Sequence, residues 1–133
     1  MKKMTQPVKL TAIKWKQYRD DDVLCAIQLI FNTHKTPMFA SSDSDGYELR
    51  TAKIDGEKRI ATIMVRVYRG YQMAALKLIS DQDEIIYDED WAPGYGQWET
   101  REIPDGEQLI GIATAESGSD YFYSLGFITG SPA

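Results

Sequence analysis

The sequence has little of the chemistry on which catalytic and metal sites depend. It contains one cysteine, Cys25, and one histidine, His34. The chain can therefore form no internal disulfide, and it offers no paired Cys/His spacing for a metal. A G-x-S-x-G nucleophile motif is also absent from the sequence. We therefore expect a protein that is not an enzyme and that uses no cofactor.

Basic residues and long apolar runs are scarce as well. The 15 Lys and Arg are outnumbered by 20 Asp and Glu, which gives a net charge of −5. A surface that follows nucleic-acid phosphates needs clustered Lys and Arg. No apolar run approaches the ~20 residues of a membrane span, and the basic start MKKMTQPVK lacks the apolar segment of a signal peptide. We expect an intracellular protein with no nucleic-acid partner and no membrane span.

The sequence does contain a β pattern along nearly its whole length. Segments 8–18, 59–68 and 108–116 carry β-branched and aromatic residues in partial alternation, with Asp, Gly and Pro turns between them. No stretch sustains the apolar i, i+3, i+4 spacing of a helix beyond about two turns. The length fits one domain, which we place at 10–130 after an N-terminal arm at 1–9.

One strand pattern returns at a fixed interval. CAIQLIF, AALKLIS and YSLGFIT start at positions 25, 74 and 123, 49 residues apart each time. Each copy follows a partner strand, so the copies align as hairpins at 10–31, 60–80 and 110–129. The two linkers, 46–58 and 96–108, correspond as well, because both carry a Gly followed by an aromatic residue and later Asp-Gly-Glu. The chain is therefore an internal repeat with an unfinished third unit.

A threefold repeat of hairpins has two common solutions, the β-prism and the β-trefoil, and in both each unit buries one face against the other two. Three short sheets suit strong hairpins separated by irregular pairs, whereas a trefoil needs three complete units. We predict an all-β, pseudo-threefold β-prism of antiparallel hairpins, with the β-trefoil as the alternative. Strand parity places six side chains at the axis: Ile27, Leu29, Leu76, Leu78, Leu125 and Phe127.

The last hairpin carries a family resemblance. GEQLIGIATAESGSDYFYSLGFIT resembles the C-terminal hairpin of the jacalin-related lectins, and SLGFIT at 124–129 matches that family's final strand. AIQLIFNTHKTPMF at 26–39 is similar to the family's strand, polar turn and aromatic residue. The likeness covers roughly residues 8–130. It implies the β-prism fold and carbohydrate binding through loops at one end of the prism.

The sequence departs from this family in two places. The family holds its sugar with a G-x-x-x-D turn, and the corresponding turns here begin at Asp21, Gly70 and Ser119. The second turn keeps the glycine, and none keeps the aspartate. The family also has an extra N-terminal pair of strands with a glycine-rich loop, which nothing before residue 10 supplies. The resemblance is therefore to a divergent, N-terminally shortened member.

A different sugar platform is expected where the second hairpin turn meets the second linker. Aromatic rings stack on the apolar faces of sugars, polar groups bind the hydroxyls, and glycines let the backbone approach closely. The candidate ligand-binding residues are Arg69, Gly70, Tyr71, Gln72, Trp91, Gly94 and Tyr95, with Asp120 and Tyr121 from the third turn. The alternative interpretation is that Trp91 and Tyr95 cap a sheet face and the glycines make a turn.

Aspartates gather in the first hairpin turn and the first linker. The weak candidates for a Ca²⁺ site are Asp20, Asp22, Asp43 and Asp45. Runs of Asp are usually solvated turns, so we expect no metal.

The unfinished third unit gives a second functional hypothesis. A sheet with only a hairpin has exposed edges, and unpaired N–H and C=O groups on an edge can pair with a strand from another chain. The protein is then an interaction or structural subunit that forms a homo-oligomer or joins a host protein complex. Carbohydrate binding remains the first hypothesis.

Overall fold

The computed structural model describes residues 8–18, 24–40, 46–68, 72–114 and 125–130. These residues form ten strands and no helix. The strands are β1 (Leu10–Gln17), β2 (Leu24–Phe31), β3 (Phe39–Ala40), β4 (Arg50–Lys53), β5 (Ile60–Tyr68), β6 (Gln72–Ser80), β7 (Ile85–Asp90), β8 (Gln97–Glu102), β9 (Gln108–Thr114) and β10 (Leu125–Gly130). No helix in these ranges is therefore long and apolar enough to cross a membrane.

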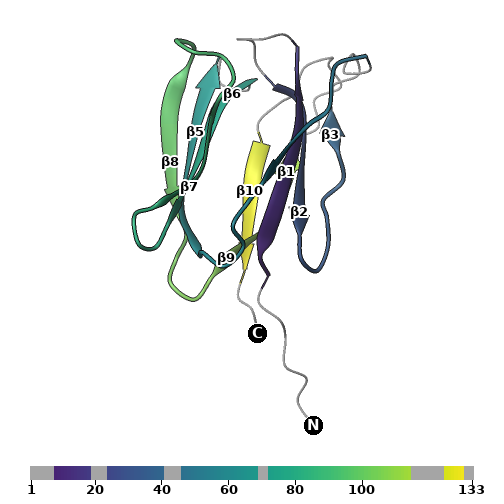
Figure 1. Cartoon of the computed structure of the whole chain (residues 1–133). Coiled ribbons are helices and arrows are strands. Elements are labelled where there is room, and N and C mark those ends of the chain that lie inside the picture. The colour runs from purple at the N-terminus through teal and green to yellow at the C-terminus, as the bar shows by residue number, and fades with distance from the viewer. Residues whose placement is uncertain (1–7, 19–23, 41–45, 69–71, 115–124, 131–133) are drawn as a thin grey trace.

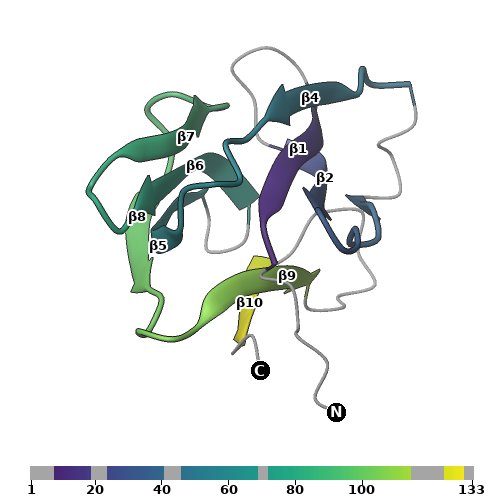
Figure 2. The same cartoon turned by 60° about the horizontal axis from the view of Figure 1, so that its bottom comes forward.

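The strands form three antiparallel sheets around a common interior, as Figures 1 and 2 show. Sheet A has the order β3-β2-β1-β4 and sheet B the order β7-β6-β5-β8. Sheet C consists of β10 and β9 in the described part of the chain. The three predicted hairpins are β1–β2, β5–β6 and β9–β10. The prediction of an all-β prism of antiparallel hairpins is confirmed.

The repeat is reproduced residue by residue in the pairing between strands. Equivalent pairs are Ile13 with Leu29, Ile63 with Leu78 and Ile112 with Phe127. All six side chains are at most 9% exposed, because equivalent positions on the three hairpins point to the same axis. Of the six predicted axial residues, five are buried: Ile27, Leu29, Leu76, Leu78 and Phe127. The side chain of Leu125 lies outside the described residues.

Each linker adds outer strands to the hairpin that precedes it. β4 pairs with β1, and β8 pairs with β5. The two linkers leave the sheets in the same way, because the N–H of Ile54 donates to the carbonyl of Thr11 and that of Ile103 to the carbonyl of Ala61, at 2.9 and 2.8 Å. Ile54 and Ile103 are both buried. The predicted correspondence of the linkers therefore holds in space.

The edges of sheet C are contacted by side chains from its neighbours. Arg101 on β8 donates through Nη1 to the carbonyl of Phe127 and through Nη2 to Thr129 Oγ1, at 3.1 Å in the second case. His34, which follows β2, lies with Nε2 2.8 Å from the carbonyl oxygen of Ile110. A carbonyl can only accept, so Nε2 carries the proton. Sheets A and B thus each reach across to one strand of sheet C.

Candidate functional site

The candidate site lies at the end of the prism where β1 and β5 finish, which is the upper end in Figure 1. Loop 91–96, between β7 and β8, covers this end of sheet B. Its first two N–H groups, from Trp91 and Ala92, both donate to the carbonyl of Ala74 on β6, at 2.8 and 3.0 Å. The N–H of Tyr95 donates to the carbonyl of Ala92 at 3.2 Å. These bonds fold the loop back over the end of the sheet.

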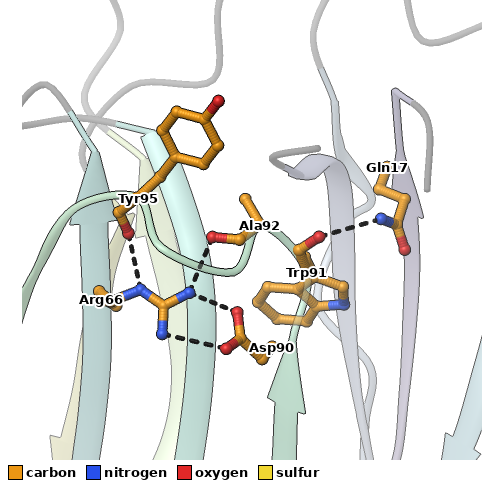
Figure 3. A network of polar contacts seen from close by, with 6 residues as sticks. All are labelled: Gln17, Arg66, Asp90, Trp91, Ala92 and Tyr95. Carbon is orange, nitrogen blue, oxygen red and sulfur yellow. Dashed lines mark hydrogen bonds and ion pairs between the residues drawn. The ribbon is translucent and has the colours of Figure 1, made fainter. Parts of the chain in front are cut away.

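Arg66 on β5 holds the two ends of this loop together (Figure 3). Its Nε donates to the carbonyl of Tyr95 at 2.6 Å, and its Nη2 donates to the carbonyl of Ala92 at 2.8 Å. Both Nη atoms bind the carboxylate of Asp90, with Nη1 at 3.2 Å from Oδ2. The Arg66 residue is 9% exposed. Such a bidentate, charge-assisted pair fixes geometry more firmly than a single bond does.

The sheet register explains how Arg66 reaches these partners. Arg66 is paired with Ala75 on β6, and Ala75 is paired with Asp90 on β7. A small side chain at the middle position lets the guanidinium extend across it to the carboxylate. On the other side, Arg66 is paired with Trp98, whose ring centroid lies 5.2 Å from Cζ. The arginine is therefore held between an aromatic ring and an acid.

Two glycines shape the loop. Gly94 and Gly96 have φ angles of 84° and 88°, in the left-handed region that favours glycine. A Cβ added to Gly96 would lie 2.5 Å from the carbonyl oxygen of Val67, whereas one added to Gly94 would meet nothing within 4 Å. Gly96 therefore permits a close approach of two backbone segments.

Four tyrosines gather at this end of the prism. Tyr68 and Tyr95 pack edge to face with centroids 5.0 Å apart, and Tyr18 and Tyr47 do the same at 5.4 Å. Tyr18 directly follows β1 and Tyr68 ends β5, so they occupy equivalent places in two repeats. Both also pack against a buried alanine pair formed by residues 74 and 92. We refer to Tyr18, Tyr47, Tyr68 and Tyr95 as the tyrosine strip.

Comparisons with known proteins agree with this architecture. No protein-family model and no curated protein matches the sequence. Solved structures match its fold: a prostate-specific WGA16 glycoprotein lectin aligns with a TM-score of 0.67 and 16% identity, over 94% of this chain and 84% of that chain. The Calystegia sepium agglutinin aligns at 0.66 with 10% identity, over 96% and 85%. Artocarpin in complex with mannotriose aligns at 0.62 with 11% identity, over 95% and 85%.

These neighbours are jacalin-related lectins, and the chain has their fold. The resemblance expected from the last hairpin is confirmed at the level of architecture. At sequence identities of 10–16%, the similarity to these lectins shows the fold alone. A ligand for this chain must therefore be argued from its own residues.

The site residues predicted from the sequence need one correction. Trp91 is 2% exposed, so its ring is not a surface for a sugar in this jacalin-like prism. Trp91 lies four residues after buried Tyr87 of β7. Side chains an even number of residues apart along a strand point to the same face, so Trp91 points toward the interior as Tyr87 does. The centroid of the Trp91 ring lies 6.2 Å from that of Trp15 in the core. The ring of Tyr87 also packs against Trp15, and burial there raises the pKa of its phenol. The alternative interpretation, in which this tryptophan covers a sheet face, is the correct one.

Tyr95 and Gly94 lie in loop 91–96, and Tyr95 is 49% exposed. Of Gln72 the backbone is described, as the first residue of β6 opposite Tyr68. Five candidate residues lie outside the described ranges: Arg69, Gly70, Tyr71, Asp120 and Tyr121. The four calcium candidates also lie outside them: Asp20, Asp22, Asp43 and Asp45. Within those ranges no group of three or more His, Cys, Asp or Glu could hold a metal.

Sequence reasoning missed the residues that support the loop. Arg66, Asp90 and Trp98 come from three strands, and Tyr18 and Tyr68 from two repeats. The available signal was an arginine between two valines of β5, opposite a small residue of the predicted partner strand. Recognising it requires the register of three strands at once.

Proposed function

We propose that the protein is a non-catalytic carbohydrate-binding module that uses the loops at the upper end of the prism. The observation that carries this proposal is the half-exposed ring of Tyr95 on a loop that Arg66 holds at both ends. Aromatic rings with a polar edge suit the mixed apolar and polar surface of a sugar. A ring that is already ordered loses little entropy when a ligand binds.

Asp90 offers hydroxyl acceptors in the same neighbourhood. A carboxylate has about four acceptor positions, and each oxygen of Asp90 accepts from one Nη atom of Arg66. The Asp90 side chain is 44% exposed, so it retains capacity for hydrogen bonds from a ligand. We propose that this acid supplies, from β7, a carboxylate of the kind that the hairpin turns lack. The mannotriose complex of artocarpin, which shares this fold, supports a saccharide as the ligand.

The test is a glycan array at neutral pH, with and without calcium, followed by calorimetry on the strongest binder. Tyr95→Ala should weaken binding at least tenfold, about 1.4 kcal/mol, because the stacking ring is removed. Ile85→Ala is the matched control, since Ile85 is 58% exposed at the far end of β7 and should bind as the unmodified chain does. An array without signal, or equal binding by Tyr95→Ala, would contradict the proposal.

A second candidate function is strand pairing with another chain through sheet C. Sheets A and B have four strands each, whereas sheet C has two over the described ranges. Ile128 on β10 is 45% exposed, which adds apolar surface beside the edge. In that case the chain forms a homo-oligomer or joins a host protein complex. The particle mass at micromolar concentration tests this: a clean monomer near 15.1 kDa that captures no partner counts against it.

A further inference from the structure

The lower end of the prism, opposite the tyrosine strip, holds a cleft of about 230 Å³. It lies where β1, β5 and β9 begin, so residues from all three hairpins line it. The nine residues of β5 separate it from the tyrosine strip by roughly 25–30 Å. The cleft is therefore independent of the proposed carbohydrate site.

The floor of the cleft is apolar and follows the repeat. Leu10, Ile60 and Leu109 line it, and each is the first or second residue of the first strand of its hairpin. They are 4%, 8% and 3% exposed. The three hairpins thus close the axis with one aliphatic side chain each, and this surface suits an apolar group.

The rim carries more positive than negative charge. Lys9, Lys58 and Arg59 line the cleft together with one carboxylate, Glu57. Lys9 pairs with Glu57 at 3.0 Å, and Lys58 pairs with Glu84 at 2.9 Å. The two carboxylate side chains are 81% and 52% exposed, and ion pairs this open contribute little. An incoming anion can therefore compete for both lysines.

Arg59 differs from the two lysines and from Arg66 in its partners. Its Nη2 donates to the carbonyls of Pro104 and Glu107, at 3.1 and 3.0 Å. Its Nε and Nη1 have no hydrogen-bond partner among the residues that the structure describes. Arg66, by contrast, uses Nε, Nη1 and Nη2. In a guanidinium the Nε–H lies on the same side as Nη2, so Nε and Nη1 of Arg59 offer separate charge-assisted hydrogen bonds to an anion and not one bidentate edge.

We propose that this cleft binds a small organic carboxylate, with the carboxylate accepting from Nη1 of Arg59 and from the neighbouring lysines Lys9 and Lys58, and with a compact apolar body on Leu10, Ile60 and Leu109. The volume is below the roughly 300–1,000 Å³ of pockets for drug-sized ligands, which sets the size of the ligand. The rim is positive although the chain has a net charge of −5. The ligand is therefore expected to be negatively charged.

An NMR titration of the ¹⁵N-labelled full chain tests the proposal with three probes. Benzoate carries both groups, benzyl alcohol lacks the charge, and inorganic phosphate lacks the apolar body. We expect saturable benzoate shifts at the amides of Lys58, Arg59 and Leu109, and at least tenfold weaker binding of the other two probes. Equal binding of benzyl alcohol would overturn the role of Arg59, and equal binding of phosphate would overturn the role of the apolar floor.

Two variants separate binding from folding. Arg59→Gln should weaken benzoate binding at least tenfold, while Lys53→Gln on β4, outside the cleft, should leave it unchanged. Because Arg59 also holds the turn at 104–107, Lys58→Glu is the second variant, and it should weaken binding at least fivefold without touching those bonds. Benzoate binding that survives both variants, or shifts confined to other regions, would overturn the proposal. Glycan binding at the upper end should be unaffected by either variant.

Discussion

Gly96 shows how a single residue sets the shape of the candidate site. Its left-handed φ brings loop 91–96 so close to β5 that no side chain fits between them. Gly94, two residues earlier, has a similar φ but open space around it. Substitutions at Gly94 and Gly96 can therefore separate two contributions to the free energy of unfolding: the strained backbone conformation and the steric clash.

Gly96→Ala should lower the free energy of unfolding by about 3 kcal/mol, since it adds a clash with the Val67 carbonyl to a strained φ. Gly94→Ala should cost about 1 kcal/mol, the conformational part alone. Urea denaturation followed by tryptophan fluorescence measures both. Equal losses in the two variants would show that the close approach to Val67 does not matter.

At the scale of elements, β10 is the strand whose neighbours differ most from those of its equivalents. β2 and β6 each have a hydrogen-bonded strand on both sides. Among the residues that the structure describes, β10 pairs with β9 on one side, and Arg101 donates to its Phe127 carbonyl. A side chain thus satisfies part of an edge that a strand satisfies in the other two sheets.

Arg101→Ala should raise hydrogen exchange at the amides of β10, because the strand loses its contact with sheet B while the carbonyl of Phe127 is left without this donor. Amides of β6 should keep their protection. Glu102→Ala, an exposed change at the next residue of β8, is the control. The role assigned to Arg101 fails if β10 exchanges at the same rate in both variants.

The three hairpins could be predicted from the sequence because each is defined locally. Alternation along β2 and β6 identified the buried side chains, and the interval between copies identified the repeat. Trp91 was misplaced, because local sequence does not distinguish a ring that stacks on a ligand from a ring that covers a sheet face. Its actual position follows from β7, whose inward parity continues past the end of the strand.

The whole molecule is organised around one shared interior. Leu29 on sheet A and Leu78 on sheet B occupy equivalent positions and are 1% and 0% exposed. Neither sheet can bury its inner face alone, so each hairpin depends on the other two.

Leu29→Ala and Leu78→Ala should each lower the free energy of unfolding by about 3 kcal/mol, through lost burial and the cavity left behind. Each variant should still unfold in a single thermal transition, because the sheets share one core. Ile85→Ala, at an exposed position, should change stability by less than about 0.5 kcal/mol. Two separate transitions in calorimetry would show that the sheets fold independently.

The sequence by itself determined the strands, their inward faces and the threefold repeat, because a period of two residues acts within each strand and needs no distant partner. The tertiary structure alone decided where Trp91 points, which loop Arg66 holds, and how residues 9, 59 and 108 come to surround one cleft. Those arrangements depend on the register between strands and on the packing of sheets, and both are set by contacts between residues dozens of positions apart.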